Sequence, residues 1–183
     1  SEIRKGADTE AILQAYQAWG RDCLNHFRGM FAFAIWDDQK QALFCARDRF
    51  GIKPFYYTIV DNVFFFASEA KALILFLDSI ETDLDGFKDY ITFQYYLDGK
   101  TLFKGIKELP PAHAMLVSDS KIDIWRYWEV YYNLDFDHTP QYFERELKRL
   151  IEDSVKLHLR ADIPLGAYVS GGLDSSIVAS VAS

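Results

Sequence analysis

The residues whose types and spacing best suit chemistry lie near the end of the chain, in Ser170-Gly171-Gly172-Leu173-Asp174-Ser175-Ser176. The two glycines allow a tight turn that brings backbone N–H groups close to an oxyanion. A helix predicted from about Asp174 adds its positive N-terminal end, and the three serines add hydroxyl donors. The segment is therefore predicted to hold phosphate.

This segment is not a Walker A loop, because the Gly-Lys-Ser/Thr of that motif is missing. Without a lysine at the γ-phosphate, we expect it to hold the β and γ phosphates as a departing pyrophosphate. Asp174 would then ligate the Mg²⁺ that neutralises the leaving group. The structural alternative is a plain glycine turn with Asp174 or Ser175 as the helix N-cap. An apolar strand predicted at 165–169 favours the phosphate loop.

Two other groups of residues invite a chemical interpretation. Arg47, Asp48, Arg49 and Lys53 place four charges in seven residues. We expect them to be scaffold: with Gly51, they would fix a turn between two hairpins, paired to each other or to backbone carbonyls.

The two cysteines, Cys23 and Cys45, are too few for a disulfide scaffold or a zinc site. Each sits in an apolar setting, which predicts a small buried side chain rather than a reactive thiol. Such thiols fit a reducing, intracellular location.

Hydrophobic periodicity predicts the elements that position these residues. The first part is an α+β unit, with Asp8 at the N-cap and Gly20 at the end of its first helix. Its strands form hairpins, and the first strand is apolar on both faces, which implies burial between two layers. The predicted helices cover 9–19, 22–27, 69–76 and 86–95, and Ser68 and Glu69 are expected to cap the helix at 69–76. The predicted strands cover 30–36, 42–46, 55–60, 63–67, 114–117 and 122–125.

The second part begins after a boundary near residues 130–140. An irregular, aromatic-rich connector leads into an amphipathic helix over 142–159. The strand at 165–169, the glycine turn and the following helix then predict the opening of a parallel α/β domain.

Composition excludes several classes of function. The net charge of −7, with scattered basic residues, argues against nucleic-acid binding. No stretch approaches the roughly 20 continuous apolar residues of a membrane helix. A chain of 183 residues, half of them apolar, matches an ordinary globular protein without a membrane or nucleic-acid partner.

Several motifs, in order along the chain, resemble known enzymes. Residues 170–176, with their lead-in at 162–169, are similar to the pyrophosphatase loop of ATP-dependent amide synthetases, in the form typical of the asparagine synthetase family. Residues 8–10, 29–37, 46–54 and 66–73 resemble successive landmarks of class II glutamine amidotransferases.

The resemblance implies a fold and a set of binding residues. Residues 1–130 would be the C-terminal part of an N-terminal-nucleophile-type glutaminase sandwich, and 131–183 the connector and the beginning of a parallel-sheet ATP-binding domain. Asp8 would bind the α-amino group of glutamine, although Ala7 replaces the family's usual serine. Asp174 would bind Mg²⁺. The residues implied for ATP are Val169, Ser170, Gly171, Gly172, Leu173, Asp174, Ser175 and Ser176.

No residue of this chain is predicted to be catalytic. The family's N-terminal cysteine nucleophile and Asn-Gly oxyanion hole would lie upstream of Ser1. We therefore expect Ser1 to be a cut end, and Ser183 to interrupt a helix. Cys23 falls within a helix-to-strand connection and is not a candidate nucleophile.

The activity implied by the resemblance is that of a ligase of asparagine biosynthesis. ATP would adenylate the side chain of aspartate, and ammonia from glutamine would attack that adenylate. The enzyme would be cytoplasmic and, by analogy, a homodimer. The alternatives are a related amidating or β-lactam-forming synthetase, or a non-catalytic scaffold if the chain is naturally this short.

Overall fold

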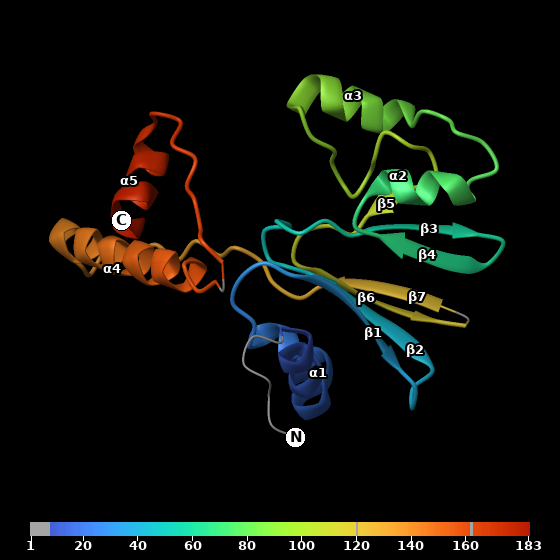
Figure 1. The fold of residues 1–183 in the computed structure, drawn as a ribbon, viewed down its shortest axis with the longest axis horizontal. Helices are drawn as coiled ribbons and strands as arrows, with labels where there is room; N and C mark the ends of the chain where they lie inside the picture. Colours follow the sequence, from blue (N-terminus) through green and yellow to red (C-terminus); the bar gives the residue numbers. More distant parts are fainter. Residues whose placement is uncertain (1–7, 120, 162) are drawn as a thin grey trace. The chain divides into compact units, whose positions relative to one another are not determined.

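The computed structural model describes residues 8–119, 121–161 and 163–183. The chain divides into two compact units, Ser1–Val130 and Tyr131–Ser183 (Figure 1). Within the described ranges, no helix combines the length and the apolar character that crossing a membrane demands.

Sheet A of the first unit has four antiparallel strands in the order β1-β2-β6-β7. Strand β2 lies inside the sheet, and five of its six residues are buried. The predicted pairing of the first two strands is confirmed, and so is the hairpin of the last two. The strands are β1 Ala32–Asp37, β2 Ala42–Arg47, β6 His113–Ser118 and β7 Lys121–Arg126.

Sheet B has three antiparallel strands in the order β4-β3-β5. Strands β3 Tyr56–Val60 and β4 Val63–Ala67 form the second predicted hairpin. Asp61 and Asn62 join them with φ angles of +50° and +62°, as a tight hairpin turn requires. Strand β5 Lys107–Glu108 was not predicted, because two residues carry no periodic signal.

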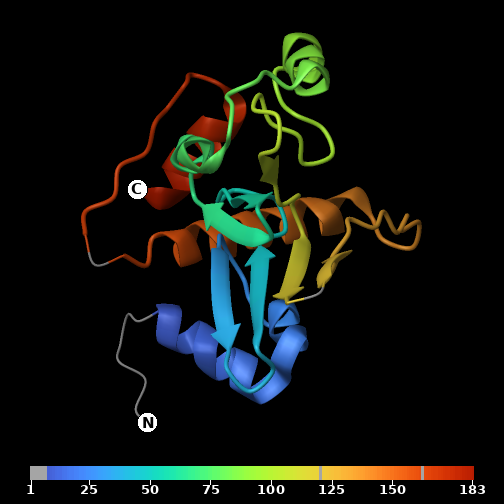
Figure 2. The same ribbon diagram turned by 90° about the vertical axis from the view of Figure 1, so that its right-hand side faces the viewer.

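The core lies on both faces of sheet A. Side chains of successive strand residues point to opposite faces. Phe44 and Ala46 accordingly join one cluster with Ala15, while Cys45 joins another with Phe55. Figures 1 and 2 show α1 on one side of sheet A and the hairpin of β3 and β4 on the other. The first strand, β1, contributes to both clusters and so lies between two layers as predicted, but of its six residues only Ile35 is fully buried.

Two predictions about helix ends need correction, and a third is confirmed. Asp8 is the first residue of α1 rather than its N-cap; its carboxylate still complements the positive helix end. Glu69 stands at the N-cap of α2, but its side chain makes no capping hydrogen bond because it pairs with Lys71 at 2.6 Å. Gly20 does end α1, with φ +57°. The helical elements are α1 Asp8–Trp19, η1 Gly20–Asn25, α2 Ala70–Leu73, η2 Ile74–Phe76 and α3 Leu84–Phe93, η1 and η2 being 3₁₀ helices.

The described residues of the second unit, 131–161 and 163–183, form two helices, α4 Pro140–His158 and α5 Leu173–Ala182. The hydroxyl of Thr139 caps α4 by accepting a hydrogen bond from the N–H of Tyr142. The strand predicted at 165–169 is wrong. No described residue pairs with this segment, and a strand exists only through the hydrogen bonds of its ladder.

Candidate functional site

The glycine–serine loop forms the entrance to α5. Gly171 has φ +82°, a conformation that a residue with a Cβ rarely adopts. Gly172 is the N-cap residue, so the helix begins at Leu173. The alternative in which Asp174 or Ser175 is the N-cap is therefore wrong.

Serine hydroxyls hold this loop in shape. The Oγ atoms of Ser170 and Ser175 lie 3.0 Å apart, and the N–H of Ser170 donates to the Ser175 Oγ at 3.2 Å. The Ser176 hydroxyl donates to the carbonyl oxygen of Gly172 at 2.8 Å. The sequence suggested these hydroxyls only as donors to phosphate; their role inside the loop depends on a backbone path that the sequence does not reveal.

The first turn of α5 remains open to an external acceptor. No side chain caps the helix, so within the described part of the chain its leading N–H groups have no side-chain acceptor. Helix N-termini of this kind favour phosphate groups, through the N–H donors and through the helix dipole.

Asp174 is exposed in that first turn, and no described residue hydrogen-bonds to its carboxylate or forms an ion pair with it. Within the described ranges no three His, Cys, Asp or Glu side chains gather to hold a metal. A single carboxylate fits Mg²⁺, which commonly binds through one or two carboxylates, waters and substrate phosphates. Val169 is 56% exposed in the extended segment just before the loop.

Asp8 belongs to the first unit and the loop to the second, so each is described by itself. The carboxylate of Asp8 is exposed at the start of α1. An exposed carboxylate is the expected partner of a substrate ammonium group.

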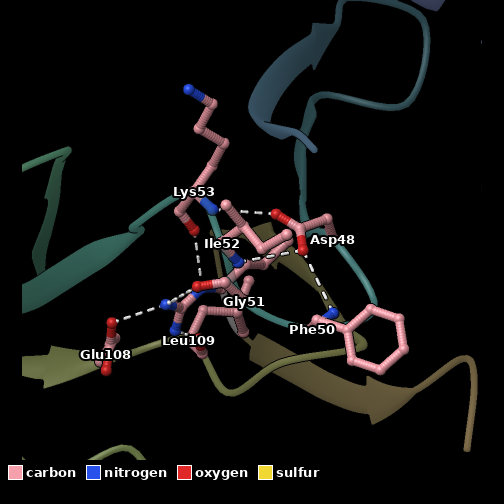
Figure 3. Close-up of polar contacts among 8 residues, drawn as sticks. Asp48, Phe50, Gly51, Ile52, Lys53, Glu108 and Leu109 are labelled. Atoms are coloured by element: carbon pink, nitrogen blue, oxygen red, sulfur yellow. Dashed lines mark hydrogen bonds and ion pairs between the residues drawn. The ribbon is translucent and has the colours of Figure 1, made fainter. Parts of the chain in front are cut away.

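The charged turn at 47–53 is scaffold, as predicted (Figure 3). Asp48 is 1% exposed, and its carboxylate accepts hydrogen bonds from four backbone N–H groups. Arg47 donates to the carbonyl oxygens of Gly51, Lys53 and Leu109. The side chains of Arg47 and Asp48 thus link the C-terminal end of β2 to residues that are distant in the sequence.

Sequence reasoning missed the ion pair between Arg47 and Glu108, whose N and O atoms lie 2.8 Å apart. The two residues are 61 positions apart, and nothing local to either residue points to the other. Glu108 lies in β5, which was itself too short to predict.

The two cysteines are buried, as predicted. Burial raises the pKa of the Cys23 thiol to about 11 and that of the Cys45 thiol to about 12. Both thiols are therefore protonated at neutral pH, and neither is a nucleophile.

Comparisons with known proteins match two parts of the chain to two families. Residues 1–128 match the family described as glutamine amidotransferase domain, and residues 146–183 match the family described as asparagine synthase. The chain is 39% identical over 186 residues to the glutamine-hydrolyzing asparagine synthetase 3 of Bacillus subtilis, covering 99% of this chain and 30% of that protein. For asparagine synthetase 1 of the same organism the identity is 36%, covering 96% of this chain and 28% of that protein.

A solved structure of the glutamine phosphoribosylpyrophosphate amidotransferase from B. subtilis superposes with a TM-score of 0.47 and 13% identity, covering 100% of this chain and 38% of that one. The chain spans less than a third of the length of the two curated relatives. Because the first family model covers more than half of its residues, this chain belongs to the glutamine amidotransferase domain family, and its C-terminal segment matches the asparagine synthase family.

Proposed function

We propose that this chain is part of a glutamine-dependent asparagine synthetase. Residues 1–130 would be the C-terminal part of its glutaminase domain, and residues 131–183 the connector and the start of its ATP-binding domain. The observation that carries the proposal is the N-terminus of α5, which no side chain caps and which follows a glutamine amidotransferase domain along the sequence.

ATP is proposed to bind at residues 169–176. The leading N–H groups of α5 would hold phosphate oxygens, and Val169 would contact the nucleotide. Asp174 would hold Mg²⁺, which when bound neutralises charge on the departing pyrophosphate. The absence of a lysine from the loop is consistent with release of pyrophosphate rather than transfer of the γ-phosphoryl group.

The proposed reaction has two steps. A side-chain oxygen of aspartate attacks the α-phosphorus of ATP, and pyrophosphate leaves. Ammonia then attacks the carbonyl carbon of the β-aspartyl-adenylate, and AMP leaves with one carboxylate oxygen. Activation is required because a free carboxylate is a poor electrophile towards ammonia.

Asp8 is proposed to bind the α-amino group of glutamine, the source of that ammonia. Asp8 is exposed at the start of α1, where its carboxylate could accept such a cation. By analogy with the family we also propose a homodimer and a cytoplasmic location, where two reduced thiols are expected.

The test uses the full-length protein that contains this sequence, supplied with ATP, Mg²⁺, aspartate, and either glutamine or ammonia. We expect pyrophosphate and asparagine in equal amounts. Asp174→Ala should abolish both products, whereas Asp8→Asn should reduce only the glutamine-dependent reaction. Asp137→Ala, an exposed carboxylate in the second unit, is the matched control.

Three outcomes would overturn parts of the proposal. Formation of ADP and inorganic phosphate would contradict the role of the loop. Pyrophosphate release with a different acid, and none with aspartate, would show that aspartate is not the substrate. Equal loss of glutamine-dependent and ammonia-dependent synthesis in Asp8→Asn would remove Asp8 from the glutamine site.

A further inference from the structure

The chain leaves the first unit through residues that are fastened to the charged turn at 47–53. The phenol of Tyr127 donates a hydrogen bond to the carbonyl oxygen of Arg47 at 2.8 Å, and burial raises its pKa to about 12. The N–H of Tyr127 donates to the carbonyl oxygen of Ala112 at 2.9 Å, and the N–H of Ala112 donates to that of Asp48 at 2.9 Å. These hydrogen bonds fix the segment that follows β7 against the turn at 47–53.

The next residue, Trp128, packs on the side chains of the same turn. Its ring meets the ring of Phe50 edge-on, with centroids 5.4 Å apart and planes at 66°. The guanidinium carbon of Arg49 lies 5.9 Å from the Trp128 ring centroid. Both geometries are attractive, the first through the ring quadrupoles and the second through the cation.

Arg49 is itself fixed from the other side. Its guanidinium donates to the backbone carbonyl oxygens of Leu24 and Phe27. Leu24 lies in η1, and Phe27 follows it closely; η1 continues directly from α1, which begins at Asp8. Arg49 therefore contacts both the segment that follows the candidate glutamine-binding helix and the last aromatic ring before residue 130.

Phe50 is a large apolar side chain at an exposed position. It remains 68% exposed even with Trp128 beside it, and its backbone N–H is held by Asp48 at 3.1 Å. The turn thus presents an apolar ring at the surface of the unit, where its ring contact is with Trp128. The Phe50 ring belongs to neither core cluster, and Trp128, the ring that it contacts, lies where the chain leaves the unit.

We propose that Arg49, Phe50 and Trp128 form an exit clamp that positions the connector, and that the clamp keeps glutamine hydrolysis coupled to synthesis. Residues 127–136 contain no helix or strand, so the packing of Trp128 on the turn leaves a shorter unpaired segment before α4. A shorter free segment restricts the arrangements that two tethered domains can sample. These three residues are positioning residues, and none is proposed to touch a substrate.

The coupling role rests on the proposed function. In the full-length protein, Trp128→Ala should leave glutamine hydrolysis and ammonia-dependent synthesis close to their original rates. The amount of glutamate formed per asparagine should rise about fivefold or more, the lower end of couplings between sites. Trp128→Phe keeps an aromatic edge for Phe50 and should restore most of the coupling.

Trp36→Ala is the matched control, because Trp36 is 56% exposed on β1 and outside both core clusters. The proposal is overturned if Trp128→Ala and Trp36→Ala give the same glutamate-to-asparagine ratio. It is also overturned if both half-reactions of Trp128→Ala fall in parallel, since that would show a structural role only.

A measurement without catalysis separates this proposal from the proposed function. Amide hydrogen exchange over residues 127–136 should be faster in Trp128→Ala than in the unchanged full-length protein or in Trp36→Ala. Unchanged exchange there would exclude the clamp even if asparagine is made. Faster exchange in a protein that makes no asparagine would keep the clamp and reject the proposed function.

Discussion

Asp48 offers the sharpest test of how the first unit is held together. Its Oδ1 accepts hydrogen bonds from the N–H groups of Phe50 and Ile52, at 3.1 and 3.0 Å. Its Oδ2 accepts from those of Phe31 and Lys53, at 3.3 and 2.9 Å. In Asp48→Asn, one oxygen becomes an NH₂ group, so whichever way the amide turns, two backbone donors face a donor.

The expected cost follows from this geometry. A buried donor left without an acceptor costs about 1–3 kcal/mol. Two such donors in Asp48→Asn give a range of roughly 2–6 kcal/mol for the loss in the free energy of unfolding, and we expect the lower end because these hydrogen bonds are only partly buried. Even that loss is a large part of the roughly 5–15 kcal/mol typical of a domain. Side-chain volume barely changes, so packing is not the cause.

The assay is denaturant unfolding of the chain, followed by tryptophan fluorescence and far-ultraviolet circular dichroism. Asp48→Asn should move the midpoint to lower denaturant without changing the slope. Asp78→Asn, an exposed aspartate in the same unit, is the control and should stay near the original midpoint. Coincident midpoints for the two variants would refute the role given to the Asp48 carboxylate.

Two further predictions concern packing and pH. The Cβ added in Gly86→Ala would overlap the carbonyl oxygen of Thr101. We therefore expect this variant to be destabilised by about 1–3 kcal/mol, although alanine has the better helix propensity. The control Gly166→Ala has nothing within 4 Å of the added atom, and its free energy of unfolding should be nearly unchanged in the same measurement. Burial raises the pKa of the Cys23 and Cys45 thiols, so the folded chain keeps both thiols protonated at a pH where the unfolded chain would ionise them. The stability that these two thiols contribute is therefore complete below the ordinary thiol pKa of 9.0, and it is lost as the pH rises towards 11 and 12. Iodoacetamide at about pH 8 should accordingly modify these thiols only after unfolding, and rapid labelling of the folded chain would contradict the prediction.

Local chemistry made much of this fold predictable. The hairpin of β3 and β4 follows from Asp61 and Asn62, which tolerate the positive φ angles of a tight turn. The amphipathic stripe of α4 likewise predicts a helix within two residues of its observed start and one of its observed end. In both cases the signal lies within a few neighbouring residues.

Contacts between distant residues were not predictable. Strand β2 pairs with β6, about 70 positions later, and no local pattern selects that partner. The run at 165–169 shows the converse: its apolar residues suggest a strand, but no described residue supplies a partner for its backbone groups. Strand formation depends on pairing as much as on composition.

The candidate site divides in the same way. The glycine turn and the helix after it were predictable because two adjacent glycines indicate a turn, and Gly171 does adopt a positive φ that other residues rarely adopt. The hydrogen bonds among Ser170, Ser175 and Ser176 were not, because they depend on the path of that backbone. Likewise, the four charges near Arg47 indicated a scaffold, but Tyr127 and Glu108 as its partners became visible only in the folded chain.

The proposed adenylation of aspartate can be tested most directly with an isotope. The full-length protein would be supplied with ATP, Mg²⁺, glutamine and aspartate labelled with ¹⁸O in its side-chain carboxylate, and the products would be analysed by mass spectrometry. We expect one labelled oxygen in the phosphate of AMP for each asparagine formed, because the carboxylate oxygen that bonds to the α-phosphorus leaves with AMP when ammonia attacks the carbonyl carbon. Label in inorganic phosphate together with ADP, or unlabelled AMP, would contradict activation of aspartate as an adenylate.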